Sequence, residues 1–293
     1  MSKIVVLGAG IAGHTAAAHL RRKLSNEHEV LVVSPNRNYQ WVPSNIWVGI
    51  GRMKPKDVTF PLEPLYKRKG IGYKQSKVVS FHPEGDVTET KPFVLVEGVY
   101  GDNLGKQEKV TYDYLINATG PKLAFDMTEG LNPGTNKAYS VCTYDHAIHA
   151  SDALHILINQ IKKSDTKVKI LIGTGHAKAT CQGAAFEYIL NVEKELQKFG
   201  VRDKAEITWI SNEYKLGDFG MDGMLLDYGG INMKSCEMVE MIFEDRDIKW
   251  ILGAGVRKVE EGLVEYENLE GEIKTETFDF AMLIPAFSGH GFK

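Results

Sequence analysis

The sequence predicts an α/β fold in which two dinucleotide-binding domains follow one another along the chain. Two observations support this prediction. An apolar run over residues 4–7 leads into a glycine-rich turn over 8–13, and a second apolar run over 168–172 leads into a similar turn over 173–178. A strand that passes through a G-x-G-x-x-G turn into a helix is typical of a Rossmann-like unit. We therefore expect two Rossmann-like domains, each a parallel sheet with helices and an antiparallel excursion.

Length and composition limit the possible functions. The chain has 293 residues with 43% apolar content, which is enough to form two buried cores. Its formal net charge of −3 argues against a nucleic-acid partner, because phosphate binding needs a basic surface. We expect no secretory signal and no membrane span, because the first apolar run is short and no stretch approaches about 20 apolar residues. Three cysteines, at 142, 181 and 236, are too few for a disulfide scaffold and too scattered for a metal site.

The first glycine turn is predicted to hold the pyrophosphate of a dinucleotide. Gly8 permits the tight turn, Gly10 lets the backbone approach the phosphates, and Gly13 lets the helix pack closely on the strand. The helix expected from His14 to about Leu24 would point its N-terminal amides at the same phosphates. The alternative is an ordinary βαβ turn without a ligand.

A second pattern selects the dinucleotide. The strand expected over 113–118 ends in Ala118-Thr119-Gly120, which resembles the strand that returns beneath FAD in flavoproteins with two dinucleotide-binding domains. FAD is therefore favoured over NAD at the N-terminal site. An acidic residue usually holds the ribose at the end of the second strand, but this chain has Ser34-Pro35-Asn36 there. Ser34 and Asn36 are able to make the same hydrogen bond as neutral groups.

Between these two patterns, the chain is expected to form three features in order. Residues 39–51 are an aromatic, glycine-rich connection, and a short helix begins near Pro61 and ends by Gly70. Alternating and β-branched residues over 72–110 predict the antiparallel excursion.

The FAD-binding domain is expected over residues 1–125, with a continuation after about residue 284, and the second domain over residues 126–284. The glycine turn of the second domain departs from the pattern, because Lys178 occupies the position of the third glycine. A lysine there would obstruct the close packing of helix on strand. We therefore interpret this part as a pseudo-NAD domain. NADH binding with altered packing is the alternative.

Two cysteines are predicted to lie near helix N-termini. Cys142 precedes a helix expected from Thr143, its N-cap, to about Lys163, and Cys181 lies in the first turn of a helix expected over about 180–198. The dipole and free amides of a helix N-terminus would lower the pKa of a thiol and favour the thiolate. The alternative for each cysteine is a small buried side chain without reactivity.

Five longer blocks resemble the bacterial sulfide:quinone oxidoreductases, and they extend from end to end of the chain. They cover residues 39–51, 118–125, 141–147, 181–188 and 282–287. The resemblance implies a flavoprotein oxidoreductase that oxidises sulfide at redox cysteines to persulfide or polysulfide sulfur. Electrons would pass through FAD to a membrane quinone. It also implies a peripheral membrane protein, docked through a C-terminal segment and otherwise cytoplasmic. Assembly into a homo-oligomer stays open.

The same resemblance implies roles for individual residues. Cys181 corresponds to one of two redox cysteines beside the flavin, and Cys142 to an auxiliary cysteine. Glu187 and His146 match ionisable positions associated with proton handling. A solvated glutamate and a helix-surface histidine are the alternatives. The residues expected at the cofactor are Gly8, Gly10, Gly13, Ser34, Asn36, Pro43, Val78, Thr119 and Gly120.

The sequence departs from the family in two places. Asp218 stands where the family usually has a histidine that handles protons, and a carboxylate is able to substitute for it there. The family also continues further, with a second redox cysteine, a quinone pocket and membrane-docking helices, so we expect no turnover from these 293 residues alone. Cys236 lies elsewhere and is expected to be structural. Three other functions remain open: an NADH:quinone oxidoreductase, a sulfide dehydrogenase that reduces a cytochrome, and a non-catalytic FAD-binding remnant.

Overall fold

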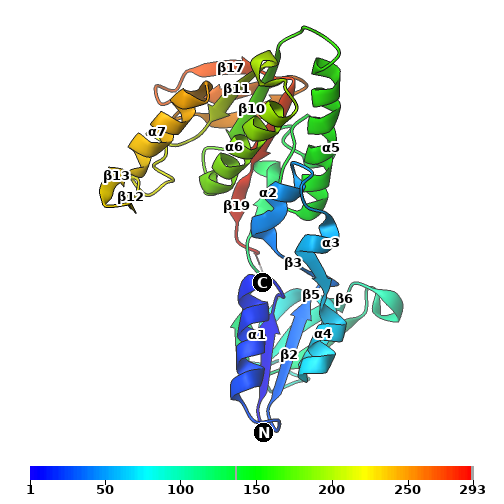
Figure 1. The fold of residues 1–293 in the computed structure, drawn as a ribbon. Coiled ribbons are helices and arrows are strands. Elements are labelled where there is room, and N and C mark those ends of the chain that lie inside the picture. Colours follow the sequence, from blue (N-terminus) through cyan, green and yellow to red (C-terminus); the bar gives the residue numbers. More distant parts are fainter. Residues whose placement is uncertain (136, 292–293) are drawn as a thin grey trace. The chain divides into compact units, whose positions relative to one another are not determined.

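The computed structural model describes residues 1–135 and 137–291, which form two compact units (Figure 1). The first unit contains residues 1–41, 59–122 and the described residues from 289 onward, and the second contains residues 42–58 and 123–288. Each unit has a parallel sheet, flanking helices and antiparallel strands, so the predicted fold class is confirmed.

The first unit is built around a sheet with the strand order β7-β6-β5-β2-β1-β8. The strands β5, β2, β1 and β8 run parallel, and β6 and β7 extend the sheet in antiparallel pairing. The predicted excursion over 72–110 is therefore antiparallel only in part, because the first residues of β5 pair in parallel with β2. The elements of this unit are β1 (Lys3–Leu7), α1 (Ile11–Lys23), β2 (Glu29–Ser34), β3 (Asn38–Gln40), β4 (Thr59–Pro61), α4 (Leu62–Lys69), β5 (Gly72–His82), β6 (Phe93–Gly98), β7 (Gln107–Thr111) and β8 (Tyr114–Asn117).

The second unit has a parallel sheet with the order β14-β11-β10-β18 and a separate antiparallel sheet, β15-β16-β17. Its helices are α2 (Asn45–Val48), α3 (Pro55–Val58), α5 (Tyr144–Ile161), α6 (Gln182–Lys198) and α7 (Ser235–Asp245). Its strands are β9 (Lys122–Ala124), β10 (Val168–Thr174), β11 (Ala205–Ile210), β12 (Leu225–Tyr228), β13 (Ile231–Lys234), β14 (Ile248–Ile251), β15 (Gly255–Glu260), β16 (Leu263–Glu267), β17 (Ile273–Thr277), β18 (Phe280–Ile284) and β19 (Ala286–Ser288). Its short 3-10 turns are η1 (Val42–Ser44), η3 (Phe125–Met127), η4 (Pro133–Thr135) and η5 (Arg202–Lys204), and the first unit contains η2 (Gly101–Asn103).

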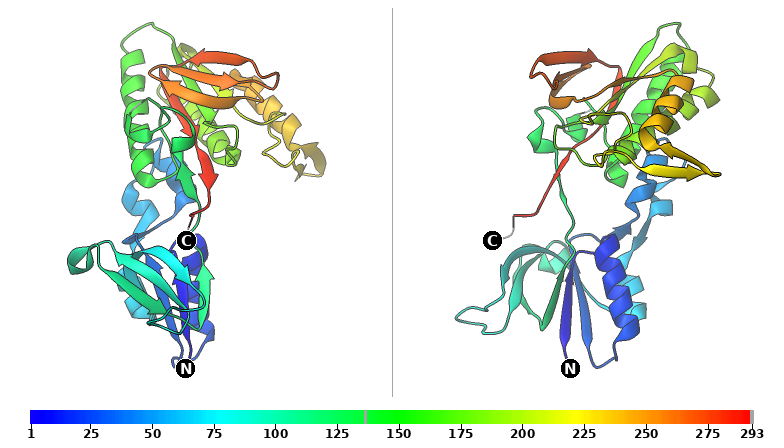
Figure 2. Two further views of the ribbon diagram at one scale, coloured as in Figure 1. Left: turned by 180° about the vertical axis from the view of Figure 1, so that it is seen from behind. Right: turned by 90° about the vertical axis from the view of Figure 1, so that its left-hand side faces the viewer.

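The helices α5 and α6 and the antiparallel strands β15–β17 lie on opposite faces of the second parallel sheet (Figure 2). A hydrophobic core lies on each of these two faces. Ile170 and Ile172 of β10 pack with the apolar faces of α5 and α6. Leu171 points to the other face and packs with residues of the antiparallel sheet, such as Val256 and Val264. This division follows from the strand period of two, which sends successive side chains to opposite faces.

The strands β5-β2-β1-β8 of the first unit and β14-β11-β10-β18 of the second follow the same order, and one hydrogen bond recurs at the same place in both sheets. In the first unit, the backbone N–H of Lys3 donates to the Asp113 carboxylate over 2.7 Å. In the second, the backbone N–H of Lys169 donates to the Asp279 carboxylate over the same distance. Each bond joins a residue near the beginning of β1 or β10 to the residue that directly precedes β8 or β18. The two units are therefore structural repeats, and their turns can be compared directly.

Residues 42–58 belong to the second unit, although the sequence predicts that they lie in the FAD-binding domain. Ile46, Val48 and Ile50 are buried in the core formed by α5 and α6. The sequence predicts that residues 39–51 form only an aromatic, glycine-rich connection after the second strand. From residue 42 onward, the apolar side chains of this stretch instead complete the core of the second unit, whereas Tyr39 packs in the core of the first.

Helix ends follow the expected local rules, with shifts of a few residues. Thr143 is the N-cap of α5, as predicted, because its hydroxyl accepts a hydrogen bond from the His146 backbone N–H over 3.2 Å. The helix α4 ends at Gly70, which has a φ of +66°. The helix α1 begins at Ile11, earlier than the expected His14, because Gly10 serves as its N-cap.

Candidate functional site

The glycine turn of the first unit is shaped by two close backbone contacts. Gly8 has a φ of +95°, and an added Cβ would lie 2.1 Å from the carbonyl oxygen of Ala118. At Gly13 an added Cβ would lie 2.0 Å from the carbonyl oxygen of Gly8. The close helix–strand packing predicted for Gly13 is therefore confirmed. Gly10 differs, because an added Cβ there meets nothing within 4 Å, which leaves its side of the turn open to a ligand.

Four further predicted residues lie at the carboxyl ends of β2 and β8, beside this turn. Ser34 is 1% exposed, and its hydroxyl oxygen accepts from the backbone N–H of Asn36 over 3.3 Å. The Thr119 hydroxyl and backbone N–H both donate to the carboxamide oxygen of Asn117, over 2.8 and 3.2 Å. Gly120 has a φ of +72° and faces open space. Ligands of open parallel sheets bind at this carboxyl edge.

Val78 and Pro43 lie in other places. Val78 is half-buried at an irregularity of β5 and packs on the core that contains Val5 and Leu7. Pro43 is exposed in η1, which belongs to the second unit. Their contact with a cofactor stays a prediction.

The turn of the second unit is longer than that of the first. Residues 175–181 separate β10 from α6, whereas residues 8–10 separate β1 from α1. Lys178 is exposed in this longer turn and lies outside α6, so the interpretation that it replaces a glycine at a helix–strand contact is wrong. The helix amides of α6 consequently do not begin directly after the strand, where a pyrophosphate would need them.

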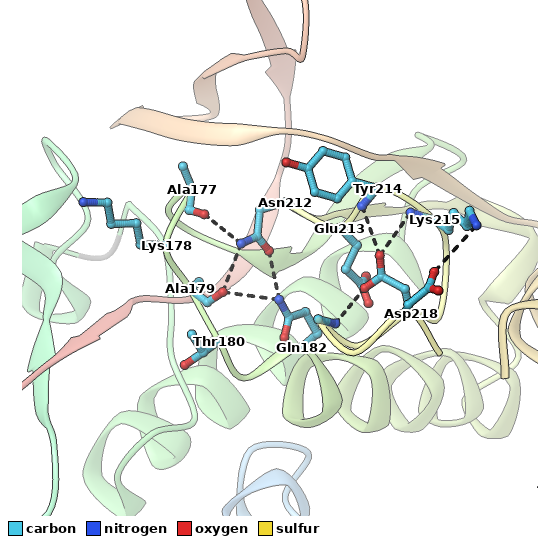
Figure 3. Close-up of a pocket in the computed structure, with 12 residues that line it drawn as sticks. Ala177, Lys178, Ala179, Thr180, Gln182, Asn212, Glu213, Tyr214, Lys215 and Asp218 are labelled. Atoms are coloured by element: carbon cyan, nitrogen blue, oxygen red, sulfur yellow. Dashed lines mark hydrogen bonds and ion pairs between the residues drawn. The ribbon is translucent and has the colours of Figure 1, made fainter. Parts of the chain in front are cut away.

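Asn212 closes the longer turn (Figure 3). Its side-chain amide donates to the carbonyl oxygens of Ala177 and Ala179 over 2.9 and 3.0 Å. Its carboxamide oxygen accepts from the Gln182 side chain over 3.0 Å. Lys178 extends away from this group in Figure 3. These residues line a cavity of about 520 Å³ beside the carboxyl ends of β10 and β11.

An acidic residue follows β11, at the position where such a residue holds a ribose in dinucleotide-binding folds. This residue is Glu213, whose backbone N–H donates to the Ser211 hydroxyl over 3.2 Å, as Asn36 does to Ser34 in the first unit. The Glu213 carboxylate is turned inward and is 3% exposed. It accepts from the Ser211 hydroxyl over 2.7 Å and from the Phe219 backbone N–H over 2.8 Å. Burial raises the pKa of Glu213 above its usual value. The inward carboxylate and the closed turn favour the pseudo-NAD interpretation over NADH binding.

Asp218, which replaces the usual histidine, organises the loop that follows Glu213. Its carboxylate accepts the backbone N–H groups of Tyr214, Lys215 and Gly220 over 3.2, 3.3 and 2.6 Å. These bonds show that the side chain holds the loop in place.

Cys142 and Cys181 lie near one another in the second unit. Burial raises the pKa of the Cys142 thiol to about 11, and the nearby Cys181 adds to this rise. The expectation that the helix dipole lowers the pKa of Cys142 is wrong, because this residue precedes the Thr143 N-cap and burial dominates. Cys181 is itself the N-cap residue of α6, one position before the helix begins.

The raised pKa predicts a slow, pH-dependent reaction of Cys142 with iodoacetamide. In a variant that keeps only this cysteine, we expect alkylation at pH 8 to be about 100-fold slower than for a solvent-exposed thiol, because the thiolate is the nucleophile. The rate should rise tenfold per pH unit up to pH 9.5 without a plateau. The same variant in urea is the control and should reach a plateau near the usual thiol pKa. A plateau below pH 9 in the folded protein would contradict the burial argument.

The other predicted catalytic residues occupy different environments. His146 lies in the first turn of α5, and its ring is edge-on to Phe125 at 5.5 Å. Burial lowers the pKa of His146, and its Nδ1 is enclosed without a hydrogen-bond partner among the described residues. A neutral imidazole is therefore favoured, which suits a proton acceptor. Glu187 is exposed on α6. Cys236 lies in the first turn of α7, against the turn at Gly223.

Within residues 1–135 and 137–291, no cluster of three or more His, Cys, Asp or Glu residues has the geometry of a metal site. None of the helices in this described part is long and apolar enough to cross a membrane.

Residues 2–184 match the family described as pyridine nucleotide-disulphide oxidoreductase. The match covers more than half of the chain, which therefore belongs to this family. Its members are FAD-binding flavoproteins, and FAD is the cofactor of this chain. The carboxyl edge of the first sheet fits this group, because Gly10 leaves the backbone open and Ser34 and Asn36 offer neutral polar groups.

Two related sequences and one solved structure are similar to this chain. A sulfide-quinone reductase of Aquifex aeolicus (strain VF5) is 31% identical over 286 residues, which cover 98% of this chain and 59% of that protein. A mitochondrial sulfide:quinone oxidoreductase of Dictyostelium discoideum is 28% identical over 213 residues, with 72% and 42% covered. The solved structure of the sulfide:quinone oxidoreductase from Aquifex aeolicus superposes with a TM-score of 0.81 at 29% identity and covers 99% of this chain and 60% of that one. This chain thus spans about three fifths of the Aquifex protein.

Proposed function

We propose that this chain belongs to a sulfide:quinone oxidoreductase and contributes the FAD-binding turn and two cysteines that take part in the reaction. The protein would oxidise sulfide to persulfide or polysulfide sulfur and pass the electrons through FAD to a membrane quinone. The observation that carries the proposal is the proximity of Cys142 and Cys181 in a unit whose second dinucleotide turn is closed by Asn212. The sulfide-quinone reductase relatives support the same assignment.

The side chains suit distinct parts of this chemistry. Bound FAD would supply a two-electron acceptor. In the oxidised protein, Cys181 would be joined by a disulfide to the second redox cysteine. The sulfur of sulfide would form an S–S bond with Cys181 while the second cysteine leaves as a thiolate. His146, favoured as the neutral base, would accept the proton of sulfide. Cys142 stays protonated at neutral pH, which suits an auxiliary role better than that of the first nucleophile. The exposed Glu187 would exchange protons with solvent.

The cofactor contacts belong to the same proposal. Gly8, Gly10 and Gly13 would hold the pyrophosphate, and Ser34 and Asn36 the ribose. The remaining predicted contacts are Thr119, Gly120, Pro43 and Val78. The FAD domain would lie within residues 1–125, without the 42–58 segment, and resume after about 284. The pseudo-NAD domain would comprise residues 126–284 together with residues 42–58. Peripheral attachment to a membrane surface, where the quinone lies, is part of the proposal.

Reduction of the flavin by sulfide but not by NADH tests this function. We expect anaerobic sulfide to bleach the visible flavin band of the complete gene product within seconds. NADH at about 1 mM, the upper end of ordinary KM values, should leave the band unchanged, because the second turn offers no pyrophosphate site. A stopped-flow spectrophotometer follows both reactions. Rapid bleaching by NADH with no response to sulfide would contradict the proposal and indicate an NADH:quinone oxidoreductase.

A further inference from the structure

Gly49 lies between the two segments that contain the thiols. An added Cβ at Gly49 would lie 2.9 Å from Cε2 of Tyr188 and 2.9 Å from Cγ1 of Val141. Val141 directly precedes Cys142, and Tyr188 lies on α6, the helix that Cys181 caps. The backbone at Gly49 therefore touches both thiol-bearing segments at once and has no space for a side chain.

Tyr188 holds this arrangement by a buried hydrogen bond. Its side chain is 0% exposed, and its hydroxyl donates to the carbonyl oxygen of Gly49 over 3.0 Å. Burial raises the pKa of Tyr188 far above its usual value, so the hydroxyl keeps its proton and stays a donor. Without this donor, the buried carbonyl oxygen of Gly49 would lose its partner, which is costly in an apolar core.

Two neighbouring contacts attach the same segment to α6 and α5. Arg52 forms an ion pair and hydrogen bond with Glu195 of α6, whose side chain is 2% exposed. Gly51 has a φ of +77°, and an added Cβ would lie 2.8 Å from Cε1 of His155 on α5. The segment is thus held at several points. Gly49 lies between Val141, which precedes Cys142, and Tyr188, which lies on the helix that Cys181 caps.

We propose that Tyr188 is a positioning residue for the thiol pair. By holding Gly49 between α6 and the segment before α5, it sets the separation and mutual orientation of the Cys142 and Cys181 sulfur atoms. The catalytic meaning of this role rests on the proposed function, but the thiol geometry itself can be measured without sulfide, FAD or quinone.

The test measures how fast a short bifunctional reagent bridges the two thiols. In a Cys236→Ser background, ethane-1,2-diyl bismethanethiosulfonate should bridge Cys142 to Cys181, and intact-mass spectrometry follows the bridged product. Tyr188→Phe should slow bridging about fivefold to tenfold, the factor that corresponds to loss of about one buried hydrogen bond. Gly49→Ala should slow it at least as much, because the new Cβ forces Tyr188 and Val141 apart.

Tyr139→Phe is the matched control. It makes the same chemical change on a half-buried tyrosine of the second unit, whose ring stacks on Phe280 at 5.2 Å. Its bridging rate should equal that of the Cys236→Ser background.

Thermal unfolding separates positioning from a general loss of stability. If Tyr188 sets the thiol geometry, the Tm difference between bridged and unbridged protein should shrink in Tyr188→Phe. The proposal would be overturned if Tyr188→Phe and Gly49→Ala both bridged as fast as the Cys236→Ser background and lowered the Tm of the bridged and the unbridged protein equally. A failure of the Cys236→Ser background itself to bridge would also overturn it. Slowed bridging in a protein that sulfide does not reduce would support the positioning role and contradict the proposed function.

Discussion

Gly10→Val is expected to abolish FAD retention while leaving the folded structure intact. An added Cβ at this position has no atom within 4 Å, and the φ of −72° is accessible to any residue, so we expect the protein to accommodate the side chain. The branched side chain would instead fill the open side of the turn, where the backbone must approach the pyrophosphate. The ratio of flavin to protein absorbance after gel filtration measures retention, and the Tm measures stability.

Gly13→Ala provides the matched contrast in the same turn. Its Cβ would lie 2.0 Å from the backbone oxygen of Gly8, and a backbone atom cannot move aside as a side chain can. We expect a loss of about 3 kcal/mol in the free energy of unfolding, measured with urea, because overpacking of a fixed contact costs this much. Full flavin occupancy in Gly10→Val would contradict the assigned site. Equal destabilisation by the two substitutions would show that the openness at Gly10 is not functional.

Cys181→Ser is expected to reduce sulfide-dependent quinone reduction by the complete gene product to background, a fall of at least about 10³-fold. A serine hydroxyl cannot form an S–S bond with the sulfur of sulfide, so the electrons have no route to the cofactor. The rate of decylubiquinone reduction at saturating sulfide measures the loss. Flavin content, measured in parallel, shows that the site is still assembled.

The other two cysteines supply graded controls for this experiment. Cys142→Ser should lower the rate less, because a buried, protonated thiol serves as an auxiliary group. Cys236→Ser should leave the rate unchanged, because this residue lies on α7 against Gly223. If Cys236→Ser removed activity as completely as Cys181→Ser, the assignment of the redox cysteine would be mistaken.

Features that depend on neighbouring residues were predictable from the sequence. The strands β1 and β10, the N-cap Thr143 and the helix end at Gly70 each follow from a pattern a few residues long. Lys178 shows where such patterns fail. The spacing of two glycines predicted a short turn, but the helix begins only at Gln182, because the intervening carbonyl groups bond to Asn212 from another strand end.

The pKa of the Cys142 thiol also could not be predicted from neighbouring residues alone. The proximity of a helix N-terminus predicts a lower thiol pKa. Burial of the same atom opposes the charged form and wins, and burial depends on residues distant in the sequence, including those of the 42–58 segment.

By itself, the sequence determined the two strand–turn–helix repeats, their order, and the need for glycine at positions 8 and 13. It did so because strand period, helix capping and backbone freedom act between near neighbours. Only the tertiary structure decided that residues 42–58 complete the second core, that Glu213 turns inward, and that Gly49 lies between the segments of Cys142 and Cys181. These outcomes depend on close packing and desolvation, which sum over contacts between residues far apart in the chain.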